Sequence, residues 1–185
     1  MPGTINTAAI FVIKTLSNLV LIVFVLRLML QWVRMDFHNP VAQFVFRTTN
    51  PLVAPLQRLV PRSRFIDLPG AIILLVVTAA VNFLLLGLQN FPWTPLSFTY
   101  FVVARIIHLT TLIYIVCIIV SAVLSWFAPG GYNPLIGALH AIVNPLLSRF
   151  RRFLPPFEGI DFSPLAAIIC LYVVRILLPL PYVLL

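Results

Sequence analysis

Four long runs of apolar residues limit what this chain can fold into. They cover residues 8–33, 70–88, 100–127 and 164 to about 178. A helix needs about 20 apolar residues to cross a hydrocarbon layer of ~30 Å, and these runs meet or approach that length. Hydrophobic residues make up 62% of the chain and charged residues 9%, which is too apolar for a soluble domain of 185 residues. The sequence therefore predicts an all-α membrane protein with four transmembrane helices.

The two outermost runs need separate comment. The first is predicted to be a retained helix, because residues 1–7 carry no basic residue and no small-residue cleavage site follows the run. In the fourth, Pro179 and Pro181 should break or kink the helix after Leu178, although residues 180–185 stay apolar. This tail either completes the crossing or lies in the membrane interface.

The basic residues predict how the helices are oriented. Twelve basic residues against four acidic ones give a net charge of +8. Connector 34–69 holds Arg34, Arg47, Arg58, Arg62 and Arg64, and connector 128–163 holds Arg149, Arg151 and Arg152. The connector between residues 89 and 99 and the N-terminal tail hold none. Because basic loops stay in the cytoplasm, both long connectors are predicted to be cytoplasmic and both termini to lie outside.

The sequence contains an internal duplication. Shifted by 94 positions, residues 30–67 match residues 124–161 with eleven identities in 38 positions. The matched motif residues are Trp32 and Trp126, Asn39-Pro40 and Asn133-Pro134, Asn50-Pro51 and Asn144-Pro145, and Asp67 and Asp161. Each unit reads helix, connector, helix, so the two units should face the same way across the membrane as parallel repeats. We assign the first repeat to residues 1–95 and the second to residues 96–185, with its last span at 164–185.

Each connector is predicted to hold two short interfacial or re-entrant helices, at 40–49 and 51–60 and at 134–143 and 145–154. Asn before Pro is a typical helix start, because Asn caps and Pro suits the first helical position. The second helix of each pair is amphipathic, with arginines outside the apolar arc. Such a helix either faces lipid headgroups or packs on the bundle. The candidate lipid- or partner-binding residues are Arg58, Arg62, Arg64, Arg149, Arg151 and Arg152.

One aspartate precedes the second predicted span of each unit. Asp161 is followed by Ser163-Pro164, which predicts a Ser cap and a Pro at the first helical position. Asp67 is followed by Leu68 and Pro69 instead. We interpret both aspartates as structural residues at helix starts rather than as parts of a reactive site.

Five basic residues fall inside the predicted spans, namely Lys14, Arg27, Arg105, His108 and Arg175. No carboxylate lies within those spans. Arg27 and Arg105 are expected to snorkel; otherwise these cations must meet lipid phosphate, Asn18, Asn82, backbone carbonyls or another protein. Arg175 is the best candidate for a partner contact or a polar cavity. The same lack of intramembrane acids disfavours a cation- or proton-coupled carrier.

The sequence offers no catalytic or metal-binding constellation. Asp36 and His38 are close in sequence, but no nucleophile with a positioned base can be recognised. Cys117 and Cys170 lie in apolar runs and are expected to be packing residues. We predict no enzyme activity, no cofactor, no metal and no nucleic-acid binding.

The doubled pattern resembles the YggT family of small bacterial membrane proteins, also called YlmG, with a chloroplast branch named CCB3. The resembling residues run from Arg27 through Trp32 to Asp67, and from Leu124 through Trp126 to Pro164. Ser121 departs from this pattern, because it stands where the first unit has Arg27. The resemblance implies the two-repeat proteobacterial type, in the bacterial inner membrane, with links to osmotic-shock tolerance and ion homeostasis.

Two functions remain open at this stage. The first is a non-enzymatic organisation or assembly factor that engages anionic lipids and a membrane-protein partner, or a second copy of itself. The second is a subunit of a small ion or osmolyte channel. The sequence favours the first, because four helices with few glycines are thin for a complete pore.

Overall fold

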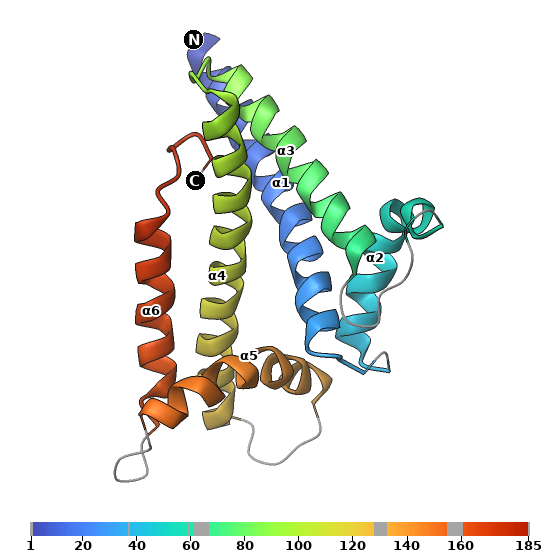
Figure 1. Ribbon diagram of the computed structural model, residues 1–185, viewed down its shortest axis with the longest axis vertical. Helices are drawn as coiled ribbons and strands as arrows, with labels where there is room; N and C mark the ends of the chain where they lie inside the picture. Colours follow the sequence, from blue (N-terminus) through green and yellow to red (C-terminus); the bar gives the residue numbers. More distant parts are fainter. Residues whose placement is uncertain are drawn as a thin grey trace.

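The chain folds into six α-helices with no strand among the residues that the structure describes (Figure 1). This computed structural model describes residues 2–36, 38–58, 60, 67–127, 133–154 and 161–184, excluding the side chains of 2–6 and 125–127. The helices are α1 (Pro2–Trp32), α2 (Pro40–Gln57), α3 (Leu68–Leu88), α4 (Pro95–Phe127), α5 (Pro134–Phe153) and α6 (Ser163–Leu177). The predicted all-α class is confirmed.

Three of these helices are long and apolar enough to cross a membrane. The candidate spans are Thr7–Trp32, Leu68–Leu88 and Pro95–Leu124. At 1.5 Å per residue, even the shortest of them, with 21 residues, is about 30 Å long. The structure therefore agrees with a membrane protein.

The fourth predicted span is shorter than the other three. α6 has 15 residues and ends before Leu178, so it covers only about 22 Å. After Leu177 the chain leaves the helix, and Leu180, Val183 and Leu184 are buried against Leu85 and other residues at the ends of α3 and α4 that lie away from α5. The open question about the end of this helix is answered, because the helix stops at Leu177.

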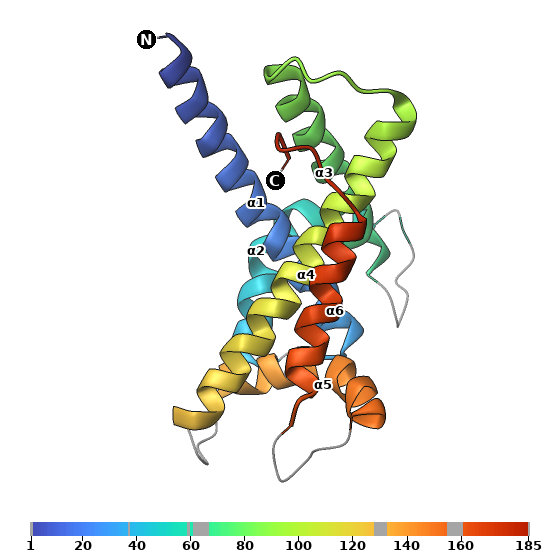
Figure 2. The same ribbon diagram turned by 90° about the vertical axis from the view of Figure 1, so that its left-hand side faces the viewer.

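The long helices form a bundle with α5 lying across its foot (Figures 1 and 2). α1 packs along α3, and α6 packs along α4. α2 lies beside the lower parts of α1 and α3, near the same end as α5, whereas both termini lie toward the opposite end (Figure 1). The two connectors therefore place their helices at one end of the bundle.

The prediction of two short helices per connector is wrong, because α2 and α5 each continue through their internal prolines. Pro51 and Pro55 lie inside α2, and Pro145 lies inside α5. In α2 the buried stripe runs through Ala42, Val45, Thr49 and Val53, and in α5 through Ala138, Leu139, Ile142, Val143 and Leu147. These stripes keep helical spacing across Pro51 and Pro145, so packing against the bundle outweighs the local cost of proline.

The capping predictions hold at the first Asn-Pro pair of each connector. Asn39 caps α2 by accepting the Val41 N–H, and Asn133 caps α5 by accepting the Leu135 N–H. Asn39 also donates its side-chain N–H to the Pro134 carbonyl at 2.8 Å. The two connector helices are therefore tied together where both begin.

The apolar arc of α5 packs on the bundle rather than facing lipid. Leu147 is buried, and the partly buried Leu146 and Phe150 pack against the same hydrophobic cluster. Only Phe153 and Leu154, at the C-terminal end, remain exposed. Of the two alternatives for these helices, lipid contact is wrong for most of this arc, because the cross-wise helix covers the lower core.

This packing predicts unequal effects for two leucines of α5. Leu147 is 5% exposed and Leu135 is 47% exposed. Leu147→Ala should lower the free energy of unfolding by about 2–5 kcal/mol through lost burial and a cavity, with a far smaller loss for Leu135→Ala. Steric trapping in bicelles measures both values. Equal losses would contradict the packing of α5 on the bundle.

Candidate functional site

Arg27 of α1 is the centre of a buried polar cluster at the foot of the bundle. It is 3% exposed, and its Nε donates a hydrogen bond to Asp67 Oδ2. One of its terminal nitrogens donates to Thr49 Oγ1 at 2.7 Å and to Asn50 Oδ1 at 2.9 Å. The guanidinium also lies 4.8 Å from the centre of the Phe46 ring. The expectation that Arg27 snorkels is wrong, because α2 and Asp67 supply partners within the protein.

Asp67 serves the helix start and the arginine together. Its Oδ1 accepts the Gly70 N–H at 3.1 Å, which caps α3 as predicted, while Oδ2 pairs with Arg27. A Cβ at Gly70 would lie 2.6 Å from Asp67 Oδ2 and 3.3 Å from Arg27 Nε. Any larger residue at position 70 would therefore displace the carboxylate of the ion pair, which passes against the backbone there. The pairing was missed because its partners are 40 residues apart, although each lies at the connector end of its span.

The equivalent acid of the second unit has a different partner. Asp161 Oδ2 accepts a 2.9 Å hydrogen bond from Arg151 Nε on α5, since Ser121 replaces the arginine of α1. Both side chains are partly exposed, at 47% for Arg151 and 32% for Asp161. Partial burial alone would raise the pKa of Asp161, but hydrogen bonds from Ser163 and Arg151 outweigh it and hold that pKa below its usual value.

The predicted Ser cap of the fourth span, which is α6, is wrong. α6 begins at Ser163, and the capping residue Phe162 has no side chain that can accept a hydrogen bond. The Ser163 N–H instead donates to Asp161 Oδ1 at 2.9 Å. Asp161 takes the structural role expected of it at this helix start, with Pro164 in the first turn.

A second buried cluster joins α1, α3 and α4 around Arg105. This arginine is 1% exposed and donates to Asn82 Oδ1 at 2.6 Å and to Asn18 Oδ1 at 2.8 Å. Snorkelling is therefore wrong for Arg105 too, and the amide partners named as the alternative from the sequence hold it. Each of the three helices contributes one polar side chain to this cluster.

The remaining cations hold the C-terminal part of the chain through backbone carbonyls. His108 Nε2 lies 2.7 Å from the Leu178 carbonyl, and Arg175 donates to the His108 carbonyl at 3.0 Å. Lys14 donates to the Tyr182 carbonyl at 3.3 Å. These bonds fasten α6 and the tail that follows it to α4 and α1. Arg175, expected to meet a partner or a polar cavity, is used within the fold.

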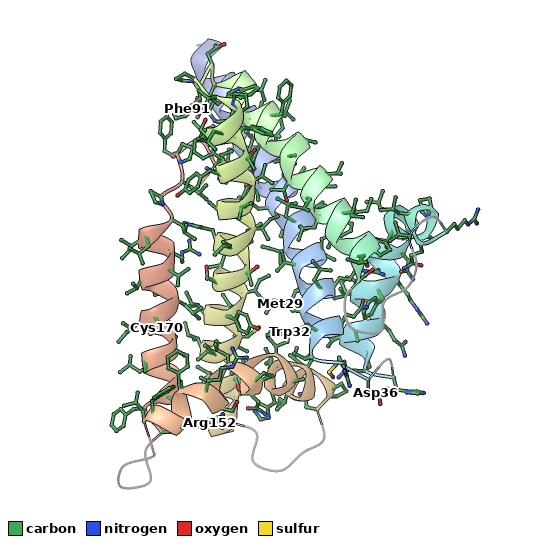
Figure 3. All side chains as sticks on the ribbon, viewed as in Figure 1. Met29, Trp32, Asp36, Phe91, Arg152 and Cys170 are labelled. Atoms are coloured by element: carbon green, nitrogen blue, oxygen red, sulfur yellow. The ribbon has the colours of Figure 1, made fainter. Side chains whose placement is uncertain are left out.

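The connector arginines lie on the surface wherever the structure describes them. Arg58 at the end of α2, and Arg149, Arg151 and Arg152 of α5, are exposed. Arg62 and Arg64 lie outside the described residues, as does the side chain of Trp126. Figure 3 shows Arg152 on α5, at the foot of the bundle. Phe153, which follows it, is 84% exposed.

The remaining motif residues are divided between packing and surface. Pro40 and Pro134 occupy the first turns of their helices, whereas Asn144 and Pro145 are exposed on α5. Asp36 and His38 form an exposed pair, with His38 Nδ1 2.8 Å from Asp36 Oδ1. Hydrogen bonds from the His38 backbone and ring lower the pKa of Asp36. Among the described residues no group of three or more His, Cys, Asp or Glu side chains could hold a metal ion.

A mostly apolar cavity of about 320 Å³ lies between α1, α3 and α4. Its lining includes Met29 and Trp32 from α1, Leu74 from α3, and Ile106 and Tyr114 from α4. Figure 3 shows Met29 and Trp32 near the lower end of α1. The cavity can accept a hydrocarbon chain but offers few polar groups to a substrate.

Removing either aspartate should distinguish the two acid–arginine pairs. Asp67→Asn retains an acceptor for the cap but leaves Arg27 as an unpaired buried charge, so stability should fall by about 3–5 kcal/mol. Asp161→Asn breaks an exposed pair and should cost less than about 1 kcal/mol. Steric trapping of the matched variants measures both losses. A similar loss of stability in both variants would contradict the larger contribution expected of the buried Arg27–Asp67 pair.

Two glycines of α3 give a second matched comparison. Gly70→Ala forces a methyl group against the ion pair and should destabilise the protein by roughly 1–3 kcal/mol. Gly87→Ala meets no atom within 4 Å and should stabilise the helix by up to about 1 kcal/mol. Thermal unfolding in the same detergent compares the two variants, and a harmless Gly70→Ala would contradict the close approach.

Comparison with known proteins places the chain in a family. The CCB3/YggT family model matches residues 6–89 and 100–182, and the two matches begin 94 residues apart, the offset that aligns the connectors. An uncharacterized protein of Pseudomonas aeruginosa is 37% identical over 94% of this chain and 89% of its own length. The uncharacterized protein YggT of Escherichia coli is 34% identical over 89% of this chain and 86% of its own length.

More distant relatives extend to plastids. A chloroplastic YlmG homolog of Arabidopsis thaliana is 37% identical over 32% of this chain and 23% of its own length. No solved structure matches the chain. The double match of the family model, together with the bacterial relatives aligned over most of their lengths, shows that this chain belongs to the CCB3/YggT family.

Proposed function

We propose that this chain is a non-enzymatic organisation or assembly factor of the bacterial inner membrane that binds anionic lipids and membrane-protein partners through the C-terminal end of α5. One observation carries the proposal. Arg149, Arg151 and Arg152 are exposed beside the exposed Phe153, on a helix that crosses the foot of the bundle. Exposed arginines beside an exposed aromatic ring are typical of a segment in the headgroup region.

The proposed placement in the membrane follows from charge. α2 and α5 lie near one end of the bundle and the termini toward the other, so basic connectors in the cytoplasm put both termini in the periplasm. In this arrangement α6 and the residues after it make the fourth crossing together, and the two repeats are parallel. The Arg27–Asp67 pair then lies near the cytoplasmic leaflet.

Two further features support lipid engagement. The cavity between α1, α3 and α4 has apolar walls that suit an acyl chain, and the exposed Trp32 beside it is a side chain that favours the interface. The Arg151–Asp161 bond is partly exposed and therefore weak, so Arg151 stays available to phosphate. The physiological setting proposed from the family resemblance is osmotic-shock tolerance and ion homeostasis.

A channel subunit is the second candidate. It is favoured by the buried Arg105 and the partly buried Lys14, since a permeation path lined by cations would attract anions. The two candidates differ in their readouts. A channel gives ion flux from purified protein in liposomes, whereas an organisation factor gives cross-links from α5 to other membrane proteins.

Neutralising the arginines of α5 tests the proposed function. The triple variant Arg149→Gln, Arg151→Gln and Arg152→Gln should prefer phosphatidylglycerol to phosphatidylcholine at least tenfold less strongly than the unmodified chain does. The reason is that each basic residue near an anionic surface contributes about 1 kcal/mol. Native mass spectrometry of protein released from mixed-lipid nanodiscs measures the bound lipid. The matched triple Arg→Lys variant keeps the charge and should keep the preference.

The same variants should be expressed in a bacterium that lacks its own family member. The Gln variant should fail to restore growth after osmotic shock and should lose cross-links at α5, whereas the Lys variant should succeed. Unchanged lipid preference and unchanged rescue in the Gln variant would overturn the proposal.

A further inference from the structure

Arg105 is a buried cation that has no acidic partner among the residues described by the structure. It is 1% exposed, and its two described hydrogen bonds go to the neutral amides of Asn82 and Asn18. The sequence contains no Asp or Glu between Asp67 and Glu158, and none before Asp36. Amide oxygens satisfy N–H groups but do not cancel a charge, so a substantial desolvation cost remains at this depth.

The cluster also has two buried donors that lack an acceptor. Arg105 Nε and Asn82 Nδ2 are fully enclosed and have no hydrogen-bond partner among the described residues. The orientation of Asn82 is fixed, because its Oδ1 accepts from Arg105 and its nitrogen must then donate elsewhere. Both unsatisfied groups are therefore N–H donors, and both call for the same kind of partner, an acceptor.

Lys14 adds a second positive charge to the same place. It lies one turn before Asn18 on α1, and it is close enough to Arg105 for the two charges to repel each other. Its hydrogen bond to the Tyr182 carbonyl, at 3.3 Å, is long. Two cations and two unsatisfied donors thus come from α1, α3 and α4, and neither cation has a salt bridge to an acid among the described residues.

We infer that a small monovalent anion, such as chloride, binds between α1, α3 and α4. It would accept hydrogen bonds from Arg105 Nε and Asn82 Nδ2 and would be attracted by Lys14. Its charge offsets that of the buried guanidinium, which a neutral acceptor cannot do. Because Arg105 and Asn82 are enclosed, a lipid headgroup or a carboxylate of another chain cannot reach these donors, so the ligand must be as small as a single ion.

The inference is independent of the proposed lipid function, since it concerns a different cluster and a different ligand. An anion held by three helices should stabilise the bundle in proportion to its occupancy. Chloride is therefore expected to raise the thermal midpoint of the purified full chain, whatever the role of α5. The arginines of α5 are not part of this site.

The test compares chloride with the bulky anion gluconate at constant ionic strength. The midpoint of unfolding of the full chain in detergent should rise with chloride and then saturate, and bromide should replace chloride. Lys14→Gln should raise the apparent Kd for chloride by at least about fivefold, because one nearby charge is lost. Arg175→Gln removes a half-buried cation that bonds the His108 carbonyl, so this matched control should keep the full chloride response.

Asn82→Asp gives the most specific result, since it places a carboxylate of the same shape beside Arg105. This variant should be as stable in gluconate as the unmodified chain is in chloride, and it should no longer respond to chloride. A midpoint that is the same in chloride and gluconate would overturn the inference, because a neutral acceptor such as water would then suffice. A chloride response that persists in Asn82→Asp would overturn it as well, because the ion would bind elsewhere.

Discussion

A guanidinium inside a membrane bundle must keep its N–H groups bonded, and this requirement determines how the helices of this chain meet. Arg27 and Arg105 are almost fully enclosed, and between them they collect partners from α1, α2, α3 and the residue that caps α3. Apolar side chains gain little by choosing one another over lipid tails, so these directional contacts define how the apolar helices are arranged. The cost of burying each arginine is lowered only in an arrangement that supplies these hydrogen-bond partners.

The two units resemble each other more in the contacts that cap their helices than in the partners of their aspartates. Asn39 and Asn133 cap their helices in the same way, and both aspartates accept backbone N–H groups just inside the helices that follow them. Only the first unit buries its acid against an arginine of the preceding span. In the second unit Ser121 stands at the position of Arg27, and Asp161 is bonded near the surface by Arg151 of α5. The first unit is therefore held by the buried Arg27–Asp67 pair, whereas the second is held by the partly exposed Arg151–Asp161 pair.

The sequence predicted those features that depend on near neighbours or on composition. Three of the predicted spans followed from apolar length, the Asn caps from two adjacent residues, and the family from the doubled motif. Predictions failed where distant contacts decide the outcome. Pro51 and Pro145 should end helices locally, yet stripes such as Val45, Thr49 and Val53 are buried only if the helix continues. Arg27 was expected to snorkel because its acid, Asp67, lies far away in the chain, and no rule of spacing brings the two together.

The difference between the halves bears on how the two ends of the molecule can act. At the connector end, the first unit uses its arginine internally, whereas the second leaves three arginines and an aromatic ring exposed on α5. Toward the other end, Lys14 and His108 occupy equivalent positions of the two units, 94 residues apart, and both bond carbonyls of the segment after α6. One side chain of each repeat thus bonds this segment, which is not itself part of a helix. Two groups of positive charge thus lie in separate places, an exposed group on α5 and an enclosed group around Arg105, and these are the places where we propose that negative charge from outside the chain binds.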